Sequence, residues 1–236
     1  MEEMYDIHCH ILPGVDDGAA HLELSLEMLK AERDSGVRTI ILTPHYRRRM
    51  FEPSMDLIHE TFERLQEEAS GLGLDLYLGC EYHANMDMVE NLQEGRRPTL
   101  AGSRFVLTEF KEDSPAEFIR ERTMALLNAG YIPVIAHFER YKAMRTSTDL
   151  VEELYERGCR MQMNADCITG KDGFFMARFA KKMAQYDLIS YVASDCHDMS
   201  RRAPHLAEAA KVLEKWGGAR YAEHILCEKP REIFEG

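Results

Sequence analysis

The feature that most constrains the fold of this chain is an alternation of short apolar runs with longer stretches of helical periodicity. Apolar runs typical of buried strands occupy residues 37–42, 74–80, 104–108, 131–136 and 188–193. Between them lie segments with apolar residues at helical spacing, such as 22–35 and 115–128. Strands that alternate with helices predict a parallel sheet with right-handed crossovers, closed into a barrel or left open.

Length and composition favour one domain over residues 1–236, because no Ser/Pro/Gly-rich linker divides the 236 residues and 45% of them are hydrophobic. No apolar run approaches the roughly 18 residues of a membrane helix, and the start is acidic, so we expect a cytoplasmic protein without membrane insertion. Six scattered cysteines without a C-x-x-C pair indicate reduced thiols. A net charge of −12 argues against nucleic acid as a partner.

A further predicted strand opens the chain at residues 5–10 and carries a His-x-His pair, His8 and His10. Alternate side chains of a strand share a face, so both imidazoles can reach one cation. Pro13-Gly14 and the Asp-Asp-Gly sequence at 16–18 then end the strand in a loop, which leaves the pair at an accessible rim. Taken alone, the pair could equally be two polar residues on an exposed strand.

The same arrangement recurs down the chain, which favours a metal site over scattered histidines. Residues able to bind a metal ion lie at the carboxyl ends of the predicted strands, and one, Asp17, lies in the first loop. The full set is His8, His10, Asp17, His45, Glu81, Glu109, His137, Asp195 and His197. The carboxyl ends of barrel strands meet at one edge, where barrel enzymes place their active sites. These ligands suffice for two or three ions, and imidazole with carboxylate suits Mn, Fe or Zn. Cys9 and Cys196 should point to the opposite face as packing residues.

Two arginines extend this interpretation toward phosphate. Arg140 and Arg202 fall in the loops that follow His137 and His197, and a guanidinium group fits phosphate oxygens bidentately. Clustered ions generate a bridging hydroxide at neutral pH and stabilise displacement at phosphorus. The set therefore predicts phosphoester hydrolysis, although either arginine alone could be a solvated surface charge.

Six short motifs follow one another with a recognisable order and spacing: His8-Cys9-His10-Ile11-Leu12-Pro13-Gly14-Val15-Asp16-Asp17-Gly18, Thr43-Pro44-His45, Gly79-Cys80-Glu81, Glu109-Phe110, His137-Phe138-Glu139-Arg140 and Ser194-Asp195-Cys196-His197. In this order they resemble the polymerase-and-histidinol-phosphatase (PHP) superfamily, and within it the manganese-dependent protein tyrosine phosphatases of bacterial capsule and exopolysaccharide operons. The resemblance covers about residues 4–203, and the last thirty or so residues add little to it.

The resemblance implies an α/β fold of the PHP type, a distorted seven-unit (β/α)7 TIM-like barrel, with three divalent ions, manganese first. It implies one ion held by His8, His10, Glu81 and Asp195, a second by Glu81, Glu109 and His137, and a third by Asp17, His45 and His197. Arg140 and Arg202 match the pair that holds the phosphate. The chain departs from the family at Phe138, where proline is usual, and in the basic run 47–49 after His45, so the loops that select the substrate differ.

The expected function is thus hydrolysis of phosphotyrosine in proteins by a metal-bridging hydroxide, linked to capsule or exopolysaccharide synthesis. The expected partners are phosphotyrosine proteins, including a bacterial tyrosine kinase. The sequence leaves open whether the chain forms a homo-oligomer. Alternatives of the same chemistry are a small-metabolite phosphatase, such as one acting on histidinol phosphate, and a phosphodiesterase. From another class, the chain could be a catalytically inactive metal-binding regulatory module.

Overall fold

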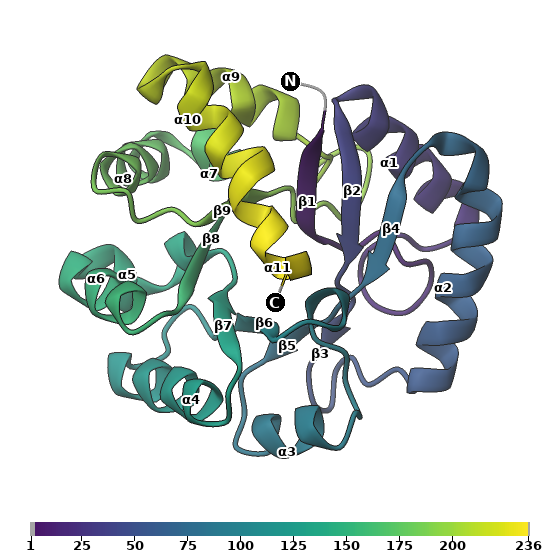
Figure 1. Cartoon of the computed structure of the whole chain (residues 1–236), viewed down its shortest axis with the longest axis horizontal. Helices are drawn as coiled ribbons and strands as arrows, with labels where there is room; N and C mark the ends of the chain where they lie inside the picture. Colours follow the sequence, from purple (N-terminus) through teal and green to yellow (C-terminus); the bar gives the residue numbers. More distant parts are fainter. Residues whose placement is uncertain (1–2, 236) are drawn as a thin grey trace.

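A parallel sheet surrounded by helices forms the body of the computed structural model, which describes residues 3–235 (Figure 1). The strands are β1 (Met4–Cys9), β2 (Val37–Leu42), β3 (His45–Tyr46), β4 (Asp75–Leu78), β5 (Glu81–His83), β6 (Phe105–Glu109), β7 (Ile132–Ile135), β8 (Arg160–Asn164) and β9 (Tyr191–Ala193). The helices are α1 (Leu22–Asp34), α2 (Met55–Ala69), α3 (Met88–Gln93), α4 (Ala116–Asn128), α5 (Lys142–Thr146), α6 (Thr148–Glu156), α7 (Ala165–Thr169), α8 (Phe174–Gln185), α9 (Leu206–Gly217), α10 (Ala219–Glu223) and α11 (Glu232–Glu235). The predicted alternation of strand and helix is therefore confirmed.

Local sequence explains where the elements begin and end. The Ser54 hydroxyl accepts a hydrogen bond of 3.2 Å from the Leu57 amide and so caps the first turn of α2. The chain after α2 turns at Gly73, whose φ of 68° is unfavourable for residues with a side chain. Strand β8 follows α6 because Gly158, with φ of 101°, ends the helix just before it.

The sheet has two hydrogen-bonded parts, with strand orders β1-β2-β4 and β3-β5-β6-β7-β8-β9. The predicted single strand over 74–80 is wrong at its end: the pairing of β2 with β4 breaks at Gly79 and Cys80 and resumes as β3 with β5. A Cβ at Gly79 would lie 2.9 Å from the Ile41 side chain, so the two strands can approach this closely only at a glycine. The break bends the sheet and delivers Glu81 to its carboxyl edge.

The curl brings the last strand next to the first. The Asp195 amide donates to the His8 carbonyl at 2.8 Å, and the His10 amide donates to the Cys196 carbonyl at 2.9 Å. Figure 1 shows the strands gathered in the middle with the helices around them. The inner face is filled by Ile7, Ile41, Leu107 and Val134, all at most 1% exposed. The polar residues that follow these strands therefore gather at one end of the curled sheet.

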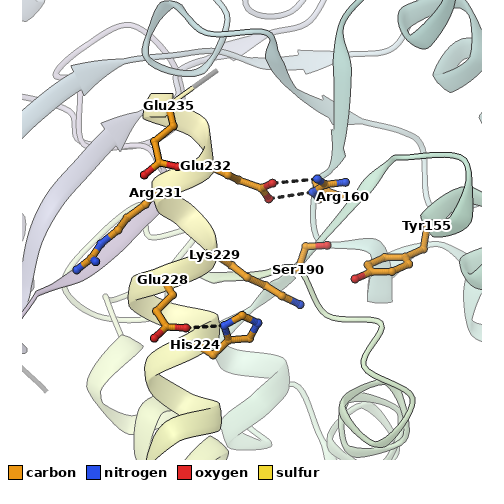
Figure 2. A pocket seen from close by; sticks show the side chains of 9 residues that line it. All are labelled: Tyr155, Arg160, Ser190, His224, Glu228, Lys229, Arg231, Glu232 and Glu235. Carbon is orange, nitrogen blue, oxygen red and sulfur yellow. Dashed lines mark hydrogen bonds and ion pairs between the residues drawn. The ribbon is translucent and has the colours of Figure 1, made fainter.

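The C-terminal segment covers the opposite end of the strands. In Figure 2, α11 lies beside the start of β8, where the guanidinium of Arg160 donates two hydrogen bonds of 2.9 Å to the Glu232 carboxylate. Ile233 is fully buried in the inner cluster of the sheet. A pocket of about 550 Å³ lies between this segment and the first residues of the strands. Ile233 of this segment is thus part of the core.

Two further predictions concern cysteines and membranes. All six cysteines lie in the described part of the chain and are free and buried. The thiol of Cys9 points toward the Ile41 carbonyl at 3.6 Å, away from the imidazoles of its neighbours, as strand alternation predicts. No helix within residues 3–235 is long and apolar enough to cross a bilayer.

Candidate metal centre

The innermost group of the site is built from β1, β5 and the turn after β9. The Nε2 atoms of His8 and His10 lie 3.3 and 3.2 Å from Glu81 Oε2, and both lie 3.5 Å from Asp195 Oδ1. All four side chains are at most 3% exposed. A tetrahedral ion with bonds of about 2.1 Å separates its ligand atoms by about 3.4 Å, so these spacings fit one cation.

Glu81 also faces a second group of side chains. Its Oε1 lies 2.8 Å from His137 Nε2, and its Oε2 lies 2.9 Å from His45 Nδ1. Glu109 has a ligand atom within 4.8 Å of those of His45 and Glu81. The carboxylate of Glu81 therefore stands at the centre of the cluster, where it can bridge cations.

The outermost group reaches solvent through Asp17, whose side chain is 50% exposed. Asp17 Oδ1 lies 3.5 Å from His45 Nε2 and 3.6 Å from His197 Nε2. Together with His10, these residues offer ligand atoms within 4.8 Å of one another. All nine predicted ligands thus meet at one mouth of the sheet.

Glu109 and His137, which the family resemblance assigns to one ion, both lie near Glu81 but beside different neighbours. Glu109 lies with His45 and Glu81, whereas His137 lies with His8 and Glu81. His45 consequently stands between the second and third groups. Its position at the start of β3, paired with Glu81 of β5, places it there.

The residues fit divalent ions on two observations. Among the described residues, four buried atoms of the cluster have no hydrogen bond of suitable geometry: His45 Nδ1, Glu81 Oε2, Glu109 Oε2 and His197 Nε2. The first two lie 2.9 Å apart but are not aligned for a hydrogen bond. Buried polar atoms normally have a partner because leaving one unpaired is costly. The donor set of imidazoles and carboxylates without thiolate is also one that Mn, Fe or Zn accepts.

Electrostatics keep two of the histidines in the form that binds metal. Burial, together with the charge of Arg140, lowers the pKa of His137 to about 4. Burial and the charge of His10 lower the pKa of His197 to about 2. Both rings are therefore neutral at pH 7, and a neutral imidazole has a free lone pair for a cation. By contrast, burial and the Glu81 charge raise the pKa of Glu109 to about 7.

The loop after β1 holds His10 through a residue that sequence reasoning missed. Asp16 Oδ2 lies 2.8 Å from His10 Nδ1 and accepts from the His45 amide at 2.9 Å. Asp16 Oδ1 accepts from the Gly18 amide at 2.9 Å. A carboxylate behind a ligating imidazole fixes the orientation of the ring. The adjacent pair Asp16-Asp17 could have indicated a second carboxylate near the site, but the sequence does not show which of the two faces His10.

Two predicted ligands have a strained backbone. His137 has φ of 29° and Asp195 has φ of 52°, in the left-handed region that residues other than glycine rarely adopt. Tyr141, also missed from the sequence, has its hydroxyl 3.3 Å from His137 Nδ1 and accepts from the Phe110 amide at 3.0 Å. Strain that surrounding contacts maintain is typical of functional sites.

Both predicted arginines reach the mouth. Arg140 Nη2 lies 2.9 Å from Asp195 Oδ2, and Arg202 Nη2 lies 3.0 Å from Asp195 Oδ1. Their side chains are about one-third exposed, at 33% and 34%. Each guanidinium has further N–H donors, so the pair can receive an anion from solvent.

The basic run after His45 belongs to a hairpin that contacts the cluster through Phe51. Backbone hydrogen bonds join Arg47 to Phe51 in a tight hairpin. The Phe51 ring stacks on the His45 ring, with a distance of 5.3 Å between the ring centroids and an angle of 11° between the ring planes. Arg48 forms an ion pair with Asp87. His83 lies on β5 opposite Glu109 of β6. The hairpin therefore contributes an aromatic ring to the site, and Arg48 is occupied by a surface carboxylate.

Comparison with known proteins agrees with this geometry. The family model for capsular polysaccharide synthesis, CpsB/CapC, matches residues 4–235. The tyrosine-protein phosphatase CpsB of Streptococcus pneumoniae is 37% identical over 239 residues, covering 98% of each chain. The tyrosine-protein phosphatase YwqE of Bacillus subtilis is 33% identical over 218 residues, covering 92% of this chain and 86% of its own.

Solved structures give the same result. Crystal structures of YwqE and CpsB, described as metal-dependent tyrosine phosphatases, include a chain that matches with a TM-score of 0.87 and 32% identity, covering 98% of this chain and 92% of that one. A phosphotriesterase from Mycobacterium tuberculosis, 13% identical with a TM-score of 0.62, shares the fold alone. The family model extends the resemblance from residue 203 to the C-terminal segment. The chain therefore belongs to the CpsB/CapC family of capsular polysaccharide synthesis proteins.

Proposed function

We propose that this chain is a metal-dependent phosphatase that hydrolyses phosphotyrosine in proteins of capsular or exopolysaccharide synthesis. The observation that carries the proposal is the meeting of nine imidazole and carboxylate side chains with two arginines at one mouth. Relatives that this chain matches over nearly its whole length are named tyrosine-protein phosphatases.

The ligands proposed here are those predicted from the sequence, with His8, His10, Glu81 and Asp195 around one ion and Glu81 as the bridging carboxylate. We propose two to three divalent ions, manganese first, with iron or zinc as substitutes. When bound, such ions lower the pKa of water to generate a nucleophile and neutralise charge on the phosphoryl oxygens.

The residues of the chain have distinct parts in this reaction. Arg140 and Arg202 bind the non-bridging phosphate oxygens and stabilise the charge that develops on them. Phe51 lines the mouth where the aromatic ring of the substrate enters. Tyrosine leaves with a pKa near 10, so a dedicated general acid is not required for this leaving group.

The proposal extends to architecture and context. Counting β2 with β3 and β4 with β5 as single interrupted strands gives seven units, the (β/α)7 arrangement of the PHP type, in one domain spanning residues 1–236. We propose a cytoplasmic protein whose partner is a bacterial tyrosine kinase carrying phosphotyrosine. The proposal does not depend on the oligomeric state, which is a separate measurement.

The test combines metal analysis with a substrate panel. Protein stripped with a chelator is reloaded with Mn²⁺, Zn²⁺, Fe²⁺ or Mg²⁺, and turnover is measured on a phosphotyrosine peptide, histidinol phosphate and an aryl diester. We expect Mn²⁺ to restore hydrolysis of the peptide above the other two substrates. Preference for histidinol phosphate or the diester would replace the proposed substrate class, and bound metal without any turnover would favour the regulatory module.

The same assay measures the effect of Glu81→Gln. Because the amide retains size but cannot bridge cations as a carboxylate does, we expect kcat/KM to fall by more than about 100-fold, the upper range for losses outside the ligand shell. Bound metal should also decrease in elemental analysis. The exposed Glu63→Gln is the matched control, expected to leave both unchanged. Full activity of Glu81→Gln would contradict the proposed site.

A further inference from the structure

Strand β8 stands beside the metal cluster without contributing any of the nine predicted ligands. Its carboxyl end carries two amide side chains, Gln162 and Asn164, which are 0% and 2% exposed. They are two residues apart, so they point to the same face of the strand, as His8 and His10 do on β1. Buried amides need hydrogen-bond partners, and these two find them in residues of the cluster and in each other.

Gln162 contacts two predicted ligands through one oxygen. Its Oε1 accepts from the His137 backbone amide at 2.8 Å and lies 2.9 Å from His8 Nδ1. The backbone amide can only donate, so the atom facing it must be the amide oxygen. The same oxygen then requires a hydrogen on His8 Nδ1. In the neutral ring, the form that binds a cation, the lone pair is therefore on Nε2, the atom that faces Glu81 and Asp195.

Asn164 continues the chain of hydrogen bonds in a fixed direction. Gln162 Nε2 donates to Asn164 Oδ1 at 2.9 Å, and Asn164 Nδ2 donates to Asp195 Oδ2 at 2.7 Å. Arg140 lies on the same Oδ2, at 2.9 Å. With its Oδ2 held in this way, Asp195 directs Oδ1 to His8 and His10. Successive amide hydrogen bonds polarise one another, which strengthens the chain as a unit.

The hydrogen-bonded chain begins and ends at the two predicted ligands with a strained backbone. His137 and Asp195 both have positive φ. The Gln162 oxygen holds the His137 amide, and the Asn164 amide group holds the Asp195 side chain. A sparsely populated backbone conformation persists only where neighbouring contacts over-determine it. Gln162 and Asn164 supply such contacts at both places.

We propose that Gln162 and Asn164 are positioning residues that set the His8 tautomer, the His137 backbone and the Asp195 rotamer for cation binding. They act through these three residues. This inference rests on the proposed function, because the cations are the divalent ions proposed for the phosphatase site. Outer-shell partners of this kind are worth about 10–100-fold in metal affinity.

The first experiment replaces Gln162 by methionine, which keeps the length of the side chain and removes its acceptor and donor. Calorimetric titration of chelator-stripped protein with Zn²⁺ and Mn²⁺ should show an affinity about 10–100-fold lower than wild type. Proton NMR of ¹⁵N-histidine-labelled, metal-free protein should show a protected His8 Nδ1–H in wild type and its loss in the variant. Gln162→Glu retains both acceptor contacts and should restore that proton signal.

The matched control is a buried amide away from the cluster. Asn91 is 7% exposed, donates to the Tyr82 hydroxyl at 2.6 Å and accepts from Arg96 at 2.7 Å. Asn91→Leu should lower the free energy of unfolding without changing metal affinity or the His8 proton. Equal metal affinity in Gln162→Met and wild type, with the proton still protected, would overturn the proposal.

A second variant covers the case in which Gln162→Met does not fold. Asn164→Asp keeps the acceptor for Gln162 but sets a carboxylate against Asp195, so metal affinity should fall while the His8 proton remains. Wild-type affinity in Asn164→Asp would overturn the proposed relay. These measurements use no substrate. Loss of metal affinity in a protein inactive on phosphotyrosine would reject the proposed function and leave this inference intact.

Discussion

At the scale of single residues, the arginines show how an acidic protein can attract an anion. The chain has a net charge of −12, and the mouth itself holds the carboxylates of Asp17, Glu81, Glu109 and Asp195. Two guanidinium groups, those of Arg140 and Arg202, lie against Asp195. The local charge of this trio is positive, and a divalent ion at Asp195 would increase it. Divalent cations held by the four carboxylates would add to the charge of the arginines, so a phosphate ester would meet a favourable potential in spite of the overall charge.

Replacement of either arginine should weaken catalysis more than folding. For Arg140→Ala we expect kcat/KM on an aryl phosphate to fall about 10²–10³-fold, because one donor group to the transition-state oxygens is lost. Arg202→Ala should behave similarly, and the surface variant Arg157→Ala is the control. Steady-state kinetics at saturating Mn²⁺ measure the effect. Unchanged kinetics would remove that arginine from the site.

At the scale of elements, the loop between β1 and α1 depends on the approach of two backbone segments. Gly18 lies so close to His10 that a Cβ on it would be 2.1 Å from the His10 carbonyl oxygen. The same segment positions Asp16, which holds His10 and the amide of His45. The loop therefore ties β1 to β3 at the level of the cluster.

Gly18→Ala should accordingly displace this loop. We expect a loss of about 1–3 kcal/mol in the free energy of unfolding, the usual range for overpacking, together with weaker metal binding. Gly71→Ala is a matched control, since no atom lies within 4 Å of its added Cβ and its φ is not positive. Urea unfolding and metal titration of both variants test the expectation. Equal stability of the two variants would contradict it.

Helix α1 contributes a second buried group of titratable residues through Glu32. Its Oε1 lies 3.9 Å from Cys196 Sγ, and both Glu32 and Asp6 are fully buried. Burial and the neighbouring Asp6 raise the pKa of Glu32, and burial raises the pKa of Asp6. Asp6 also accepts from the Ser194 amide at 3.0 Å, so the pair joins α1, β1 and β9.

This pair predicts a stability that decreases as pH rises. Unfolded Glu32 releases its proton near pH 4.5, while the native carboxyl keeps it, so its contribution is fully present below that value and is lost as pH rises toward the raised native pKa. The slope is at most about 1.4 kcal/mol per pH unit for one proton. Glu32→Gln should flatten the curve of unfolding free energy from pH 5 to 8. Parallel curves for wild type and variant would contradict the assignment.

At the scale of the whole molecule, the C-terminal segment closes the end of the sheet opposite the metal cluster. Arg160 at the start of β8 binds Glu232 with two hydrogen bonds (Figure 2). Ile233 is buried with Ile7 and Val134. The two ends of the curled sheet thus have separate tasks. One end positions polar groups, and the other end is covered by the C-terminal segment, which buries Ile233 in the apolar inner cluster.

Ile233→Ala should therefore destabilise the protein while leaving the site intact. We expect a loss of about 2–5 kcal/mol in the free energy of unfolding, the range for removing a buried isoleucine side chain. The kcat/KM of the folded fraction should stay near the wild-type value. Leu57→Ala, at a position that is 44% exposed, is the control with a small effect. A loss as small as that of the control would show that the segment is not part of the core.

The sequence alone determined the class of fold, the set of candidate ligands and the family. Residues such as His45, Glu81 and His137 follow apolar runs, and parallel strands place the residues that follow them at one edge whatever the details of packing. Alternation likewise determined that Cys9 faces away from its histidine neighbours. These conclusions depend on local periodicity, which can be read directly from the sequence.

Only the tertiary structure decided how the candidates are grouped and what holds them. The break between β4 and β5, the contacts of Gln162 and Asn164 and the contact of Asp16 with the His45 amide depend on residues distant in the sequence. The positive φ of His137 is likewise held by Gln162. The sealing of the far end by Ile233 depends equally on the curl of the whole sheet. A local pattern assigns a side chain to a face or an edge, whereas distances and hydrogen bonds follow from how those faces are folded together.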